Sequence, residues 1–178
     1  MMQKTTLNLQ GVQLKISPEN IVCNKNYKFN NVPIYISGND ETFIKSLEDF
    51  FLRLFRQGGF VDFNKVKKIN LHKPSENLFG DKCVNVFYSP ANIDEDVIKL
   101  LVQNGDGLII SSKTNAKDKG LKKIFANHNN YLLVECYKLS RSSKSKILNY
   151  FFDKNKIKLS KEIYWFLLDG LDNRYAFL

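Results

Sequence analysis

The sequence has few cysteines and histidines, and they are scattered. Its 178 residues include three cysteines, Cys23, Cys83 and Cys136, and two histidines. It has no CxxC pair and no Cys/His cluster, so the pattern predicts neither a metal site nor a disulfide framework. An odd number of separated cysteines favours a reducing, cytoplasmic setting. His72 and His128 belong to no nucleophile motif, and each is interpreted as a surface residue.

Long apolar runs are also missing. No stretch approaches the roughly 20 apolar residues that a membrane-spanning helix needs. Residues 1–15 have no apolar block after their first lysine, so no signal peptide is predicted. We therefore expect no membrane partner. With 43% apolar residues, the composition fits a globular chain. Its length suffices for one α/β domain, or for one domain and part of another.

Apolar runs alternate with helical patterns through the middle of the chain. The predicted strands are the largely apolar runs 32–38, 83–89, 107–112 and 131–137, together with a strand-like segment at 65–71. The predicted helices lie between them, with an apolar stripe from Phe43 to Phe55 that stops at Gly58, and with helices over 94–104 and 118–128. Strands that are apolar throughout are buried on both faces. The pattern therefore indicates a parallel sheet with helices on both faces.

The two ends of the chain differ from this block. Residues 1–31 are weakly patterned, and the short alternation in "LNLQGVQLKI" favours a small hairpin or an extended arm. After residue 138, two helices are predicted in succession without a strand between them, with Ser140 and Ser160 as their N-caps. The final "DNRYAFL" is interpreted as the start or middle of another helix.

Positive charge is concentrated near the C-terminal end. The net charge is +9, and the segment from Lys138 to Lys161 holds eight basic residues and one acid, a net +7 that leaves +2 for all other residues. Such a segment suits nucleic acid or an acidic partner. A solvated helical face explains it equally well. The candidate contacts are Lys144, Lys146, Lys154 and Lys156.

The first strand–helix junction has the outline of a phosphate-binding loop but not its residues. A P-loop needs G-x-x-x-x-G-K-[ST]. Here Gly38 is present, but Phe43 stands at the second glycine position and Ile44 at the lysine position. Lys45 is one residue late, which turns it by about 100° around the helix. Asp40 adds a negative charge where phosphates would lie, so nucleotide binding is not expected.

The other elements of an NTPase site are missing from the sequence. A Walker B strand ends in carboxylates that hold Mg²⁺ and polarise water. The runs "VNVFYSP" and "GLIISSK" end without one. The acidic residues 94–96 could imitate a metal cluster, but an acidic first helical turn explains them more simply. No catalytic residue, cofactor or metal ligand is predicted, so a chain of this kind is expected to act through its surfaces.

A Leu-Phe pair in "SENLFGDK" is the candidate surface feature. Leu78 and Phe79 stand between two predicted strands, with polar residues on both sides. From spacing alone, the simpler interpretation is that the pair caps the core. The alternative is that it is presented to a partner.

Four stretches resemble, in order and spacing, the delta subunit of bacterial DNA polymerase III, the clamp-loader subunit that opens the sliding clamp. They are "VPIYISGNDETFI", "SENLFGDKCVNVF", "LLVECYKL" and the segment from "KILNYFFDKN" to the C-terminus. The resemblance spans residues 32–178. The chain departs from the family pattern at Asn77, where serine is frequent, and at Asp81, where a second glycine is common.

The resemblance implies a fold and a domain order. It implies a degenerate P-loop NTPase domain of AAA+-like type over residues 32–138 and the start of a small all-helical lid domain over 139–178. Residues 1–31 would precede them as an arm or hairpin. The family's third domain, a helical collar, is expected to be absent, and the chain is interpreted as a fragment or a truncated product.

The resemblance also implies a function without catalysis. Leu78 and Phe79 match the pair that delta inserts into a hydrophobic pocket of the beta sliding clamp, with Ser75, Glu76 and Asn77 as the presenting segment. The implied partners are the clamp, the gamma/tau and delta prime subunits, and primed DNA held by the complex. ATP and Mg²⁺ would be bound only by partner subunits, in the cytoplasm at the nucleoid-associated replisome. The alternative is a basic nucleic-acid-binding module on an inactive NTPase fold.

Overall fold

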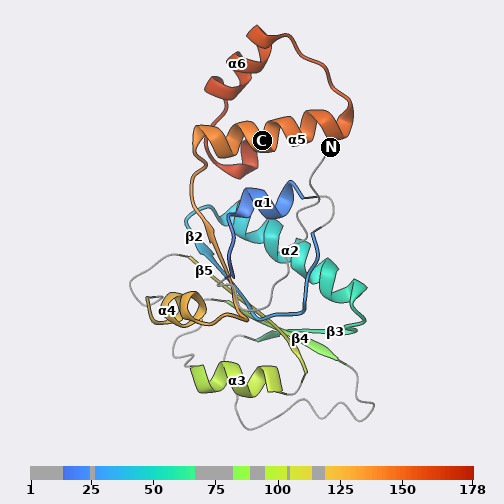
Figure 1. The fold of residues 1–178 in the computed structure, drawn as a ribbon, viewed down its shortest axis with the longest axis vertical. Coiled ribbons are helices and arrows are strands. Elements are labelled where there is room, and N and C mark those ends of the chain that lie inside the picture. The colour runs from blue at the N-terminus through green and yellow to red at the C-terminus, as the bar shows by residue number, and fades with distance from the viewer. Residues whose placement is uncertain (1–13, 25–26, 67–81, 89–94, 104, 114–118) are drawn as a thin grey trace.

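The computed structural model describes residues 14–24, 27–66, 82–88, 95–103, 105–113 and 119–178. Within these ranges the strands are β1 (Leu14–Lys15), β2 (Ile34–Gly38), β3 (Asp62–Val66), β4 (Cys83–Tyr88), β5 (Gly107–Lys113) and β6 (Leu132–Cys136). The helices are α1 (Pro18–Val22), α2 (Glu41–Gln57), α3 (Glu95–Gln103), α4 (Lys119–Asn127), α5 (Arg141–Asn155), α6 (Lys161–Gly170) and the short 3₁₀ helix η2 (Tyr175–Phe177). Strand and helix alternate from β1 to β3 and again from β4 to β6, and after β6 the described elements are helical (Figure 1).

The described strands form one parallel sheet in the order β1-β6-β2-β5-β4-β3. Strand β2 lies inside the sheet, where Ile34 pairs with Ile109 of β5 and with Leu132 of β6. All five residues of β2 are buried. The prediction of a parallel sheet is confirmed, and its physical reason is the continuous apolar character of these strands.

Helices cover both faces of the sheet, as predicted (Figure 1). Alternate residues of β2 point to opposite faces. Ile36 belongs to a core shared with α1, α2 and α5, whereas Tyr35 belongs to a second core shared with α3 and α4. The sheet therefore separates two apolar layers.

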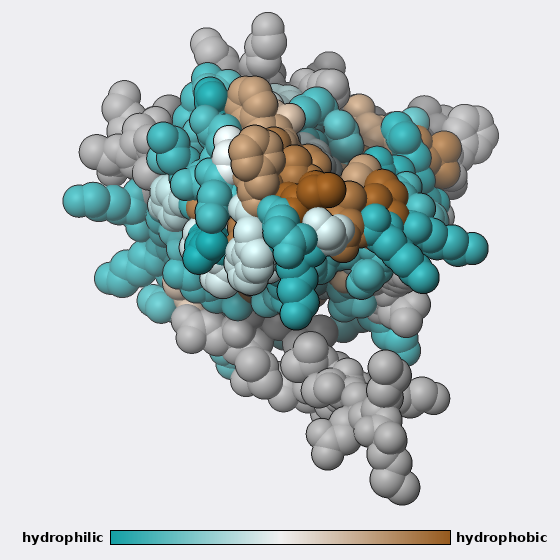
Figure 2. All heavy atoms as spheres, turned by 90° about the horizontal axis from the view of Figure 1, so that it is seen from above, coloured by the Kyte–Doolittle hydropathy of each residue, from teal (hydrophilic) through white to brown (hydrophobic). Residues whose placement is uncertain are grey.

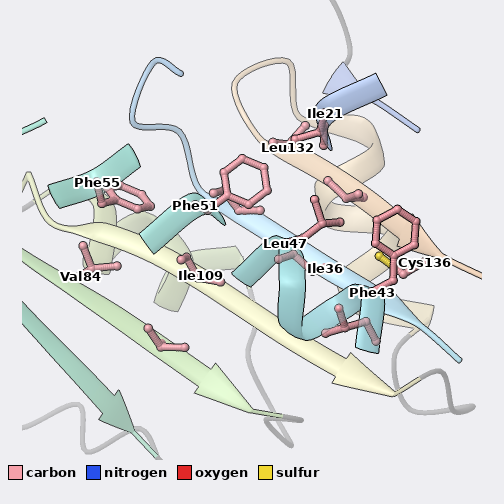
Figure 3. Packing of buried hydrophobic residues seen from close by; sticks show 14 of the residues in the cluster. Ile21, Ile36, Phe43, Leu47, Phe51, Phe55, Val84, Ile109, Leu132 and Cys136 are labelled. Carbon is pink, nitrogen blue, oxygen red and sulfur yellow. The ribbon is translucent and has the colours of Figure 1, made fainter. Parts of the chain in front are cut away.

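Helix α2 forms the main cover of the first face. Its residues Phe43, Leu47, Phe51 and Phe55 recur at helical spacing and are fully buried against the strands (Figure 3). The helix ends at Gln57, and the next residues are Gly58 and a Gly59 with φ of 86°. The predicted stripe and its glycine stop are both confirmed.

The N-terminal prediction needs correction for the residues that the structure describes. Strand β1 adds to the sheet in parallel with β6, and α1 buries Ile21 in the core. Residues 14–22 are thus part of the packed domain rather than a hairpin or an arm. The five-residue α1 is too short to show helical periodicity in the sequence. Pro18 at its start is the local signal that could have revealed it.

Two further boundaries differ from the sequence prediction. Strand β3 begins at Asp62, three residues before its predicted start, and the predicted residues 67–71 lie outside the described part. The C-terminal "DNRYAFL" holds only the three-residue η2. An isolated turn of this kind is held by tertiary contacts rather than by its own hydrogen bonds.

The α5–α6 pair packs above the first face of the sheet (Figure 1). Its predicted caps are confirmed, since Ser140 Oγ accepts a hydrogen bond from the backbone N–H of Ser143 at 3.1 Å and Ser160 Oγ accepts one from that of Ile163 at 3.4 Å. Ile147 of α5 joins the core beneath. None of the helices in the described residues is long and apolar enough to cross a membrane.

Candidate functional site

The junction between β2 and α2 is the position at which a P-loop fold would bind phosphate. Gly38 has φ of 155°, and a Cβ atom there would lie 1.8 Å from the carbonyl oxygen of Cys136. The same oxygen accepts hydrogen bonds from the backbone N–H groups of Asn39 at 3.0 Å and Asp40 at 3.1 Å. Only glycine fits this close approach. The residues that follow β2 are therefore hydrogen bonded directly to the end of β6.

Asp40 occupies the N-terminus of α2 with its own carboxylate. Its Oδ1 accepts hydrogen bonds from the backbone N–H of Phe43 at 3.1 Å and from Thr42 Oγ1 at 2.7 Å. Its Oδ2 accepts one from the backbone N–H of Tyr175 at 2.7 Å. The residue is only 3% exposed. A helix N-terminus attracts anions through its free N–H groups and its dipole, and here the anion is supplied by the chain itself.

The C-terminal segment covers this helix start. The ring of Tyr175 stacks on that of Phe43, with centroids 4.1 Å apart and planes 3° from parallel. The backbone N–H of Leu139 donates to the carbonyl of Asn173 at 2.7 Å. Phe43 and Ile44, which replace the P-loop glycine and lysine, are both buried in the core. This junction therefore joins the start of α2 to the C-terminal segment.

A cleft of roughly 320 Å³ lies beside α2, where β4 and β5 end. Glu48, which is 1% exposed, accepts hydrogen bonds there from the hydroxyl of Tyr88 at 2.6 Å and from Ser111 Oγ at 3.3 Å. Burial, and then the hydrogen bond to Glu48, raise the pKa of Tyr88 to about 12. At the rim, Lys113 pairs with Glu41 at 2.7 Å.

Sequence reasoning missed Glu48, although a carboxylate inside an apolar helix stripe is a usable signal. Its neighbours on the stripe are Ile44, Leu47 and Phe51. The carboxylate is already bound by hydroxyl groups and by Lys45 at 3.4 Å. Among the residues that the structure describes, no group of three or more His, Cys, Asp or Glu side chains could hold a metal ion. The cleft therefore contains a buried carboxylate whose oxygens are already hydrogen bonded within the chain.

The four lysines predicted as a patch are not all on one surface. Lys144 is only 3% exposed, and its Nζ donates to the carbonyl of Leu171 at 2.7 Å, so it is a structural residue. The ammonium of Lys146 contacts the side chain of Asn20 near α1. Lys154 and Lys156 are exposed at the end of α5. The predicted patch must be corrected, because Lys144 belongs to the interior.

The residues predicted to contact a clamp belong to one short segment of the sequence. All of them lie outside the described residues: Ser75, Glu76, Asn77, Leu78 and Phe79. In sequence they belong to the connection between β3 and β4, the two strands at one edge of the sheet.

The remaining histidine and acidic predictions concern ordinary structural roles. The His128 ring stacks on Tyr131 with centroids 3.8 Å apart, whereas His72 lies outside the described residues. In the acidic first turn of α3, Glu95 pairs with Lys99 at 2.8 Å. Burial raises the pKa of the Cys136 thiol well above its ordinary range, which favours the neutral thiol over the thiolate.

Sequence reasoning also missed an exposed apolar area on α5, α6 and the turn between them. Its members are Phe151, Ile157, Leu159, Ile163, Trp165 and Phe166. The signal was six consecutive apolar residues, "IYWFLL", inside one short helix.

Comparison with known proteins adds no relative. A scan of the chain against protein-family models finds no matching family, and a search of curated proteins finds no match.

Proposed function

We propose that this chain is a non-catalytic clamp-loader subunit of the delta type, which binds and opens the beta sliding clamp during DNA replication. The observation that carries the proposal is the α2 N-terminus. It has the strand–turn–helix outline of a P-loop, yet the Asp40 carboxylate fills the phosphate position. A P-loop-like fold with this position filled acts through contacts with other molecules rather than through hydrolysis.

The layout of the sheet supports an AAA+-like domain. If the five longer strands β2 to β6 are counted one to five in chain order, their spatial order is 5-1-4-3-2. The first of them is inside the sheet, and the helical α5–α6 pair follows the last. This arrangement agrees with an AAA+-like domain followed by the start of a lid, which the resemblance implies.

Nucleotide binding is assigned to partner subunits for an electrostatic reason. A bound triphosphate would have to displace the buried Asp40 carboxylate or share the α2 N-terminus with it, and like charges at such distances repel strongly. Phe43 and Ile44 supply no positive charge. ATP and Mg²⁺ therefore belong to the gamma/tau subunits of the proposed complex, in which delta prime also takes part.

Leu78 and Phe79 are the proposed clamp contact. Two large apolar side chains that enter a preformed pocket form a typical binding hot spot. Fully burying each one is worth roughly 1.5–3 kcal/mol. Together they would account for an affinity change of about 100-fold or more.

A binding assay with the beta sliding clamp of the same organism tests this proposal. The double variant Leu78→Ala with Phe79→Ala should weaken clamp binding by about 100-fold or more and leave the circular dichroism spectrum unchanged. The matched control is Leu100→Ala, which removes an exposed apolar side chain from α3 and should bind normally. Clamp binding that is equal in the double variant and the parent would contradict the site.

The basic segment supports a second candidate function, nucleic-acid binding. Its net charge of +7 includes the exposed Lys154 and Lys156. Replacing both with glutamine should lower the affinity for single-stranded DNA and reduce the slope of log affinity against log salt by roughly 0.7 per lost phosphate contact. The control replaces Lys119 and Lys123, two exposed lysines of α4. An unchanged slope would mean that the segment is a solvated face.

A further inference from the structure

The outer side of the α5–α6 pair, here called the α6 surface, is apolar. It consists of Phe151, Ile157, Leu159, Ile163, Trp165 and Phe166. Phe166 is 77% exposed and Trp165 is 50% exposed. Figure 2 looks onto the end of the molecule that carries these helices and shows an apolar area bordered by hydrophilic side chains.

The helix beneath this surface is held in place. Leu168 is buried, the hydroxyl groups of Tyr164 and Ser145 are hydrogen bonded at 2.6 Å, and Arg141 pairs with Asp169 at 2.9 Å. These contacts fix helix α6 to α5. A helix that is apolar all round is normally buried, and a contiguous exposed apolar patch marks an interaction site. The anchored α6 therefore presents its outer side for a partner to cover.

The border of the α6 surface is basic on balance, because its exposed lysines outnumber the exposed acids Asp153 and Glu162 that flank them. Residues 154–161 contain four lysines and no acidic residue. All four, Lys154, Lys156, Lys158 and Lys161, are exposed. A partner that covers the apolar centre must bring these ammonium groups close to its own edge, so negative charge on the partner is favoured and positive charge is disfavoured.

We propose that the α6 surface docks an acidic amphipathic helix of another protein. The aliphatic side chains of Ile157, Leu159 and Ile163 suit the apolar face of a helix better than nucleic-acid bases. The lysine border suits glutamate and aspartate on the flanks of that helix. A second copy of this chain is disfavoured because it would bring the same lysines to the interface. The proposed clamp contact lies elsewhere in the sequence, in the connection between β3 and β4.

A peptide-display selection with the purified chain tests this proposal without a known partner. The probe is a library of random 16-residue peptides. We expect enriched peptides to carry an excess of Asp and Glu, with apolar residues spaced three and four apart. Their affinity should fall at least tenfold for Phe166→Ser and for Ile163→Ser, whose parent side chains are at least half exposed. It should also fall for the double variant Lys154→Glu with Lys158→Glu.

Matched controls distinguish binding at the α6 surface from nonspecific binding to exposed apolar or charged side chains. Leu100→Ser removes an exposed apolar side chain of α3, and Lys119→Glu reverses an exposed charge of α4. Both should bind the enriched peptides like the parent. Circular dichroism of every variant should match the parent spectrum.

Several results would overturn the proposal. One is the enrichment of peptides without acidic excess, and another is undiminished binding by Phe166→Ser and Ile163→Ser. Sedimentation of the parent as a dimer that Phe166→Ser converts to monomer would assign the surface to a second copy. If no peptide is enriched and the chain binds phosphatidylglycerol vesicles only when Phe166 is present, the surface would be assigned to a membrane. If it instead binds a 20-residue oligo-dT only when Phe166 is present, the surface would be assigned to nucleic acid.

Discussion

The buried carboxylate of Asp40 joins the start of α2 to the C-terminal segment. It accepts hydrogen bonds from Thr42 and Phe43 in the first turn of α2 and from Tyr175 near the C-terminus. A negative group at this place also interacts favourably with the helix dipole. The side chain that caps the start of α2 therefore also holds the C-terminal segment in place.

Replacing Asp40 with alanine should lower the free energy of unfolding by about 2–4 kcal/mol. Loss of the N-cap costs about 1 kcal/mol, and the partly buried N–H of Tyr175 loses its acceptor at a further cost of roughly 1–3 kcal/mol. Urea denaturation measures the change. The control is Asp49→Ala, on the same helix with a 48% exposed side chain, for which a change within about 0.5 kcal/mol is expected. Equal losses in both variants would refute the special role of Asp40.

Among the secondary-structure elements, α2 and β4 are linked by the hydrogen bond between Glu48 and Tyr88. The bond requires a neutral phenol beside the carboxylate. The pKa of Tyr88 is raised from 10.0 to about 12, so the folded state favours the protonated form. The stability that this link contributes is fully present below pH 10 and is lost as the pH rises through 12.

The comparison of the parent with Tyr88→Phe should show this dependence. The difference in their free energies of unfolding should be constant up to about pH 10 and then shrink by about 1 kcal/mol toward pH 12, a modest amount because Tyr88 is partly exposed to screening solvent. Tyr27, whose pKa burial also raises to about 12, is common to both proteins and cancels. A difference that stays constant across this range would contradict the link.

The elements that the sequence predicted best are those whose burial is periodic. In the stripe from Phe43 to Phe55 and in the apolar strands, the residues that are apolar are also the ones that are buried. Local pattern and tertiary packing therefore agree. In contrast, the burial of Lys144 depends on the carbonyl of Leu171, 27 residues away. No local pattern in a basic run marks one lysine as interior.

The candidate site was harder to predict than the fold. The sequence alone shows that the P-loop glycine and lysine are replaced, and that Asp40 brings a negative charge to the place where a phosphate would lie. Its role as an N-cap that binds Tyr175 was not visible, because the two residues are 135 positions apart. The α6 surface was missed because the pattern "IYWFLL" was interpreted only as a helix, and exposure depends on what packs around it.

At the scale of the whole molecule, the helical C-terminal part is fastened to the sheet domain at several points. Ile147 enters the core of the first sheet face. Ser143 Oγ donates to Glu19 of α1 at 2.9 Å. Tyr175 binds Asp40 and stacks on Phe43. These contacts cross the boundary near residue 138, so the two parts should unfold together.

The single tryptophan makes this coupling measurable, because Trp165 lies in α6 while far-UV circular dichroism reports on all helices and strands. In the parent, urea transitions followed by tryptophan fluorescence and by circular dichroism should coincide. In Tyr175→Ala, the stack on Phe43 is lost, at a cost of about 0.5–1.5 kcal/mol, and the fluorescence transition should move to lower urea than the circular dichroism transition. The control Phe177→Ala, a half-exposed neighbour, should keep the two transitions together. Separate transitions already in the parent would show that α5 and α6 unfold independently of the sheet and that the Asp40–Tyr175 contact does not couple them.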